Sequence, residues 1–230
     1  MISRTDIRLR REQHMTTPPL ADLLRRRRAP ARRTALRVAA LASVPVVLAL
    51  TGLLHPHHLT PDTAERWTTL HLLLLPLFPL LAGSPLLLLR GMGGPWATTA
   101  RLGCYIYAIF YTALDAIAGV AYGTLTANTD DPATLTRAGA ALDVVGGTLG
   151  LIGSLGFLLA SVATTAALAA RHGGRRAAAG GTVLITASVL WLGSHIYWPE
   201  GVLTALALGL GFALLGIASP RGAAPESAAG

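Results

Sequence analysis

Residues 67–89 read WTTLHLLLLPLFPLLAGSPLLLL and contain no arginine, lysine, aspartate or glutamate. A helix needs about 20 mainly apolar residues to cross a hydrocarbon layer of about 30 Å. This stretch meets that requirement, and five further stretches resemble it in length and composition. The six apolar stretches cover residues 36–54, 67–89, 102–125, 141–170, 182–198 and 201–219. The sequence therefore predicts an all-α, polytopic membrane protein with about six transmembrane helices.

The rest of the 230-residue chain is too short for a soluble domain of ordinary size. We therefore expect a single six-helix transmembrane domain over residues 36–219. Residues 1–35 are polar and basic and lack helical periodicity, which predicts a disordered cytoplasmic tail. Residues 220–230 are predicted to form a disordered C-terminal tail.

Arginine is distributed asymmetrically about these stretches. The chain has 19 arginines and no lysine, and the alternation of six spans places 17 of the arginines on one side. Only Arg66 and Arg137 fall on the other side. Because arginine-rich segments stay in the cytoplasm, the predicted topology has both termini inside (N-in, C-in).

The net charge of +8 is concentrated before residue 38. The tail over residues 1–35 has no aromatic side chain on which a base can stack, so we expect no nucleic-acid partner. Arginine beside a membrane attracts anionic lipid headgroups, so the lipid bilayer and its anionic lipids are the expected partners. Arginine without lysine is typical of GC-rich genomes, which favours a multi-pass protein of the bacterial inner (cytoplasmic) membrane. The sequence leaves a homo-oligomer open.

Proline and glycine predict how the helices bend and pack. Three prolines in the second stretch predict a bent helix or two helical pieces, with Ser84-Pro85 opening the second piece. The fourth stretch has a row of small residues, which predicts a central packing helix. The fifth and sixth stretches are separated only by residues 199–201, which predicts a tight hairpin. The prolines and glycines concerned are Pro76, Pro79, Pro85, Gly146, Gly147, Gly150, Gly153 and Gly156.

Four ionisable side chains lie within or at the edge of the apolar stretches. They are His71, Asp115, Asp143 and His195. Ionisable groups in a span cost about 2.5–3.5 kcal/mol on insertion scales, so each is a candidate functional residue. Helical rise places three of the four near the outer surface and Asp115 deeper, about 15 Å from the outer end of its span. All four are therefore expected in the outer half of the membrane.

These residues support three competing functional hypotheses. In the first, imidazole and carboxylate groups bind zinc, copper or a small polar ligand, with His71 and His195 as ligands. Three loop histidines (His55, His57 and His58) are further metal candidates. In the second, His71 and His195 are the axial ligands of a b-type haem. In the third, Asp115 with the tyrosines on its helix face (Tyr111 and Tyr122) lines a proton or solute path.

Each residue also has a purely structural interpretation. Shallow histidines can be hydrated at the interface, and Asp143 can cap the start of a helix. For Asp115, the structural interpretation is a hydrogen bond from Tyr111 or Tyr122. The common GxSxG, HExxH and phosphate-loop motifs are absent, so the sequence does not predict an enzyme. We therefore expect an outward-facing site that binds a ligand or metal or handles a solute; the alternative is a structural or partner-binding membrane subunit without a ligand site.

Overall fold

The computed structural model describes residues 20–219 and their side chains from residue 31 onward. This part of the chain is helical and contains no β-strand. The elements are α2 (Leu20–Gly52), η1 (Pro61–Thr63), α3 (Ala64–Leu81), α4 (Gly83–Leu88), α5 (Pro95–Leu114), η2 (Asp115–Ala121), α6 (Tyr122–Ala127), α7 (Pro132–His172), α8 (Gly174–Leu190) and α9 (Glu200–Ala218). The chain divides into two compact units at Leu36, and the helical bundle described below is the second unit, from Arg37 onward.

Five of the helical segments are long and apolar enough to cross a membrane. They begin with Ala31–Gly52, which is the C-terminal part of α2, and include α3 with α4, the continuous α5–η2–α6 segment, α7 and α9. The remaining long helix of the bundle, α8, lies between α7 and α9 in the chain and has 17 residues. The predicted class, a helical multi-pass membrane protein, is confirmed.

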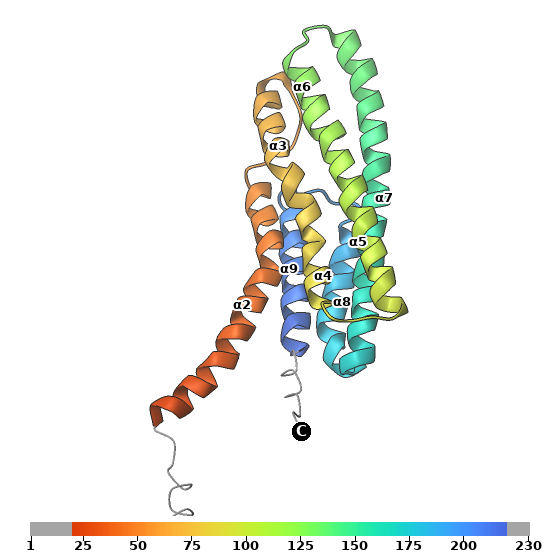
Figure 1. Ribbon diagram of the computed structural model, residues 1–230. Helices are drawn as coiled ribbons and strands as arrows, with labels where there is room; N and C mark the ends of the chain where they lie inside the picture. The colour runs from red at the N-terminus through yellow and green to blue at the C-terminus, as the bar shows by residue number, and fades with distance from the viewer. Residues whose placement is uncertain (1–19, 220–230) are drawn as a thin grey trace, which may run out of the picture. The chain divides into compact units, whose positions relative to one another are not determined.

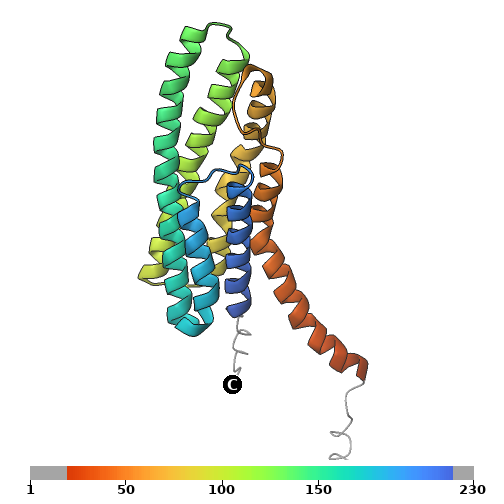
Figure 2. The ribbon, with the colours of Figure 1, turned by 180° about the vertical axis from the view of Figure 1, so that it is seen from behind.

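The bundle has one end at which several connections gather (Figures 1 and 2). The α4–α5 connection, the α7–α8 connection and the last turn of α9 lie there. The short turn between α6 and α7 lies at the opposite end, and the α8–α9 connection lies partway along α7 (Figure 1). Arg90 and Arg171 belong to the first end, which we call the basic end. There Arg37 donates hydrogen bonds to the carbonyls of Gly216 and Ser219, which joins α2 to the end of α9.

Two predicted boundaries were wrong. Helix α2 begins at Leu20, so the predicted disordered tail is helical from that residue onward; residues 1–19 and 220–230 lie outside the described part. Helix α8 ends at Leu190, although apolar sequence continues to residue 198. Residues 191–199 instead form a non-helical connection to α9, which replaces the predicted three-residue hairpin turn. Apolar composition indicates burial but does not distinguish a buried helix from a buried non-helical segment.

The glycine row on α7 lets two long helices approach closely, as predicted. Helices α5 and α7 form the most extensive contact between elements (Figures 1 and 2). A Cβ on Gly153 would lie 2.8 Å from the backbone nitrogen of Tyr111, and one on Gly103 of α5 would lie 2.6 Å from the carbonyl oxygen of Gly156. Gly147, in contrast, has no neighbouring atom within 4 Å of its Cβ position. Replacing glycine by alanine should therefore disturb the packing at Gly103 and Gly153 but not at Gly147.

We predict that Gly103→Ala destabilises the bundle, because its Cβ would meet backbone atoms that cannot move independently. Overpacking of this kind costs about 1–3 kcal/mol. Thermal unfolding in detergent measures the effect, and Gly147→Ala is the matched control because it adds a methyl group into open space. Equal melting temperatures for the two variants would contradict this description of the α5–α7 contact.

The proline-rich second span forms two helical pieces. The sequence had predicted either one bent helix or two pieces. Helix α3 ends at Leu81 with Pro76 and Pro79 inside it, and α4 begins at Gly83. The Ser84 hydroxyl donates a hydrogen bond of 2.8 Å to the carbonyl oxygen of Leu41 on α2. Ser84 therefore links two spans and makes no capping hydrogen bond.

Candidate metal centre

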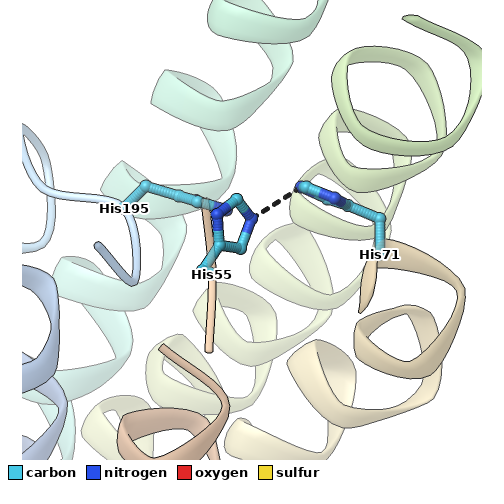
Figure 3. Close-up of side chains that lie close together, drawn as sticks. All are labelled: His55, His71 and His195. Atoms are coloured by element: carbon cyan, nitrogen blue, oxygen red, sulfur yellow. Dashed lines mark hydrogen bonds between the residues drawn. The ribbon is translucent and has the colours of Figure 1, made fainter. Parts of the chain in front are cut away.

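Three histidine side chains from distant parts of the sequence meet in the bundle (Figure 3). His55 follows the end of α2, His71 lies on α3, and His195 lies in the non-helical connection between α8 and α9. One ring nitrogen from each of the three lies within 4.8 Å of the others. His55 and His71 are buried, and His195 is partly buried. We call these three residues the histidine cluster.

Glycines without room for a side chain bring the three segments together. A Cβ on Gly52 of α2 would lie 2.2 Å from the Ile196 carbonyl oxygen, and one on Gly201 of α9 would lie 1.8 Å from the His195 carbonyl oxygen. The connection that carries His195 is therefore packed directly against two helix ends. The cluster owes its geometry to these close backbone approaches, which only glycine permits.

Backbone hydrogen bonds determine the tautomers of two of the rings. His55 Nδ1 lies 2.8 Å from the Pro56 carbonyl oxygen, and His71 Nδ1 lies 2.8 Å from the Trp67 carbonyl oxygen. A carbonyl oxygen only accepts hydrogen bonds, so both Nδ1 atoms carry the proton and donate it. Both Nε2 atoms are consequently bare in the neutral rings.

The two bare nitrogens face each other. His55 Nε2 and His71 Nε2 are 3.4 Å apart (Figure 3). Two lone pairs at this distance repel each other unless a cation, either a metal ion or a proton, lies between them. His55 lies outside the membrane-spanning helices, and burial lowers the pKa of its imidazole to about 4. Nδ1 donation to a backbone carbonyl is also the usual outer contact of a metal-binding histidine.

A buried carboxylate lies beside the cluster. Asp115 is 1% exposed, and its Oδ1 is 3.8 Å from His71 Nε2. Among the described residues, neither carboxylate oxygen has a hydrogen-bond partner. Asp115 opens η2, a seven-residue π-helical segment between α5 and α6. Such segments are rare and often occur at functional sites. An unpaired buried carboxylate is costly, and a bound cation would compensate its charge.

The third histidine of the cluster, His195, contacts the side chain of Tyr111. The Tyr111 hydroxyl lies 3.2 Å from His195 Nδ1. Metal binding through His195 Nε2 requires the tautomer in which Nδ1–H donates to the Tyr111 oxygen. Tyr111 would then fix the ring orientation, as the two backbone carbonyls do for His55 and His71.

We predict that Tyr111→Phe weakens metal binding about 10- to 100-fold, the usual effect of removing an outer contact of a ligand. The ring packing is retained, because phenylalanine keeps the aromatic contact with Phe78 at a centroid distance of 4.8 Å. Competition with a chromophoric zinc chelator measures the change in Kd. An unchanged Kd would exclude Tyr111 as a support for His195.

Aromatic rings surround the cluster. Trp67 stacks on His71 with ring centroids 4.9 Å apart, and Tyr197 lies edge-on to His55 at 4.8 Å. Phe78 packs against His195 at 5.6 Å. These rings limit the movement of the imidazoles and exclude water from the side of the cluster that they cover.

A cavity of about 630 Å³ adjoins the cluster. Its walls include His71, Asp115 and His195 together with residues of α7. This volume lies within the usual range of small-molecule sites, about 300–1,000 Å³. The site therefore combines potential metal ligands with space for a second molecule.

The structure brings together some of the predicted residues and separates others. His55, His71, His195 and Asp115 form one group. His57 and His58 are exposed and line the cavity, as do Tyr122 and the exposed Asp143, but these four are not in the cluster. The hydrogen bond expected from Tyr111 or Tyr122 to Asp115 is not formed among the described residues. Tyr111 contacts His195 instead.

Asp115 does not lie deeper than the histidines, in contrast to the prediction from helical rise. It is adjacent to His71 because α5, η2 and α6 form one segment of 33 residues. That segment extends well beyond one membrane thickness, so counting from its end overestimates the depth of Asp115.

A b-type haem between His71 and His195 does not fit this arrangement. Their rings are parallel within 7° at a centroid distance of 6.0 Å, but the His55 ring packs against both, at 4.9 and 5.7 Å. A porphyrin between the two would have to occupy the position of His55. A single ion is the better match for three converging imidazoles.

Sequence reasoning missed several contributors. Tyr197 follows His195 by two positions in a segment that was interpreted as helix, where the two side chains would point in different directions. Gly119 packs against the His71 ring, which its own sequence context does not reveal. The π-helical segment likewise has no recognisable sequence signal.

Comparison with protein-family models, curated proteins and solved structures found no match to this chain.

Proposed function

We propose that this membrane protein binds one transition-metal ion through His55, His71 and His195, with Asp115 supplying a compensating negative charge. The observation that carries the proposal is the pair of bare Nε2 atoms 3.4 Å apart, each held by an Nδ1–H donated to a backbone carbonyl. That arrangement is unfavourable without a cation. The unpaired Asp115 carboxyl group, 3.8 Å from His71 Nε2, supports the same proposal, because a bound cation would stabilise its ionised form.

Zinc is the metal that the ligand set favours most. Imidazole suits zinc, copper, iron and nickel, and three histidines form a common catalytic zinc site. Zinc–nitrogen bonds of about 2.0–2.1 Å in tetrahedral geometry place ligand nitrogens about 3.4 Å apart, which matches the distance between His55 and His71. The protein offers no thiolate to the site, since Cys104 is buried elsewhere on α5 and is the only cysteine.

The site is assigned to the outer side of a bacterial cytoplasmic membrane. Helices α8 and α9, of 17 and 19 residues, rise by about 25 and 28 Å, close to the thickness of a hydrocarbon layer. The segment between them, with His195, would then lie near the membrane surface away from the basic end. The excess of arginine assigns the basic end to the cytoplasm, where anionic lipids are the expected partners of the N-terminal arginines.

A second candidate needs no metal. The contact between His55 and His71 also fits two imidazoles that share one proton, with Asp115 as counter-ion, in a membrane subunit of structural role. The two candidates differ in stoichiometry: one requires one bound ion per chain and the other none.

Equilibrium dialysis of the detergent-purified protein against zinc tests the proposal. We expect one tightly bound zinc per chain in the wild type and none in the His55→Ala/His195→Ala variant. The matched control is His57→Ala/His58→Ala, because these exposed histidines come from the same loop but lie outside the cluster. The control should bind zinc as the wild type does.

A wild-type protein without tightly bound zinc, copper or iron would overturn the proposal and favour the shared proton. Loss of zinc in the His57/His58 variant alone would place the metal in the exposed loop and would also overturn it.

A further inference from the structure

We infer that the metal has an open coordination position facing the cavity, and that the site hydrolyses an ester or amide bond of a small molecule bound there. This inference rests on the proposed metal centre. Three observations lead to it: the number of ligands, the position of the cavity and a set of buried polar groups without partners.

The ligands leave one position free. Three histidine nitrogens would hold the metal, and catalytic zinc sites with three protein ligands keep a further position for water. The cavity of about 630 Å³ borders His71 and His195 and extends along α7 past Gly147. A molecule in the cavity can therefore reach the metal without displacing a protein ligand.

Three residues with unpaired polar atoms border the same cavity, and the unpaired atoms themselves are buried in its wall. Trp67 and Trp191 both border it, are 8% and 1% exposed, and have indole N–H groups without an acceptor among the described residues. Asp115, which also borders it, has two unpaired acceptor oxygens. Buried polar groups are normally paired, so several unpaired ones at one cavity require an explanation. Small side-chain movements in the wall would let a bound carbonyl compound and a metal-bound water pair them.

With a metal held by the three histidines, Asp115 would lie close enough to accept a proton from a water on that metal, and the water oxygen would attack the carbonyl carbon of the substrate. Asp115 would return the proton to the departing alcohol or amine as its bond to the carbonyl carbon breaks. One water is consumed, a carboxylic acid and an alcohol or amine are formed, and no electron is transferred. Zinc supports this chemistry because it lowers the pKa of bound water to about 7.

The walls of the cavity indicate the class of substrate. Aromatic and apolar side chains such as Trp67 and Leu114 border it, and Asp143 and Tyr122 add polar groups away from the metal. An acidic group in the wall disfavours a second negative charge on the substrate. The best match is a neutral or cationic ester or amide with an apolar portion.

Acetohydroxamate binding to the cobalt-substituted protein tests the open position. Hydroxamate oxygens bind a metal that has an exchangeable water, and the visible spectrum of cobalt reports the change of ligand. We expect a saturable spectral shift. If cobalt binds but acetohydroxamate leaves its spectrum unchanged, the metal site is closed and the inference is overturned.

Two α7 variants test whether the ligand enters through the cavity. Gly147→Leu fills the cavity from an exposed wall position with open space around its Cβ. Thr148→Leu is the control, since Thr148 is exposed and its hydroxyl donates a hydrogen bond to the Val144 carbonyl of its own helix. We expect Gly147→Leu to bind cobalt normally and to bind acetohydroxamate at least about tenfold more weakly, because the added side chain removes accessible volume. Equal binding by both variants would contradict the role of the cavity.

Hydrolysis of p-nitrophenyl acetate by the zinc-loaded protein tests the reaction. This activated ester has a leaving group that needs no protonation, so an accessible zinc-bound hydroxide should cleave it. We expect zinc-dependent turnover that falls at least about 100-fold in Asp115→Asn, in keeping with the usual effect of losing a general base. Asp115→Asn keeps the three histidines but loses the compensating charge, so it should bind zinc more weakly and is compared with the wild type at saturating zinc.

The outcomes distinguish this inference from the proposed function. If the protein binds no metal, both the proposed metal centre and the inferred hydrolysis are wrong. A protein that binds one zinc and hydrolyses the ester no faster than Asp115→Asn keeps the metal centre and loses the hydrolytic activity.

Discussion

His71→Ala is expected to weaken zinc binding by about three orders of magnitude. His71 Nε2 is the central donor of the site, 3.4 Å from His55 Nε2 and 3.8 Å from Asp115 Oδ1. Structural zinc gains about 10–16 kcal/mol from a complete ligand set, so the loss of one of three histidines costs about 4 kcal/mol, or about a thousandfold in Kd. Chelator competition measures the change.

Loss of the fold has to be separated from loss of the ligand. His71 is buried against Trp67, so alanine leaves space in the core. His71→Gln fills most of that space and should weaken zinc binding to a similar extent, so that it is loaded only at high zinc concentration, while keeping the melting temperature of the metal-free protein. Zinc binding of wild-type strength in His71→Gln would contradict the assignment of His71 as a ligand.

Gly119→Ala is expected to weaken zinc binding about a hundredfold, although it changes no ligand. The added Cβ would lie 2.1 Å from Cδ2 and 2.4 Å from Cγ of the His71 ring. The ring must therefore move by more than the few tenths of an ångström that metal–ligand distances tolerate. Isothermal titration with zinc gives the affinity.

Gly83→Ala is the control for this prediction. It makes the same substitution in helix α4, where the Cβ meets no atom within 4 Å. It should leave the zinc affinity unchanged. Equal affinities for Gly119→Ala and Gly83→Ala would show that the position of the His71 ring does not determine binding.

The sequence predicted the helical membrane class of this fold because the length of its apolar stretches is a property of the chain alone. It also predicted the close approach along α7, since the spacing of Gly150, Gly153 and Gly156 is visible without coordinates. The end of α8 was wrong for a physical reason. Trp191 and Ile196 are as buried as helix residues of the core, so their hydropathy does not reveal that the backbone between them is not helical.

For the candidate site, the cost of ionisable groups in apolar segments selected His71, His195 and Asp115 as candidates. It did not show that they meet or that His55, rather than His57 or His58, joins them. Those facts depend on where α2 ends and on how Gly52 and Gly201 let the His195 segment approach. Contacts between segments that are 16 to more than 100 residues apart leave no periodic signal in one sequence.

Zinc K-edge X-ray absorption of the detergent-purified, zinc-loaded protein tests the central proposal most directly. We predict a first shell of nitrogen and oxygen at about 2.0–2.1 Å, with the outer-shell scattering of three imidazole rings. The outer-shell signal should be reduced by one ring in His71→Gln and be unchanged in His57→Ala/His58→Ala. A first shell of oxygen without imidazole scattering, or one that changes only in the His57/His58 variant, would contradict a metal centre at His55, His71 and His195.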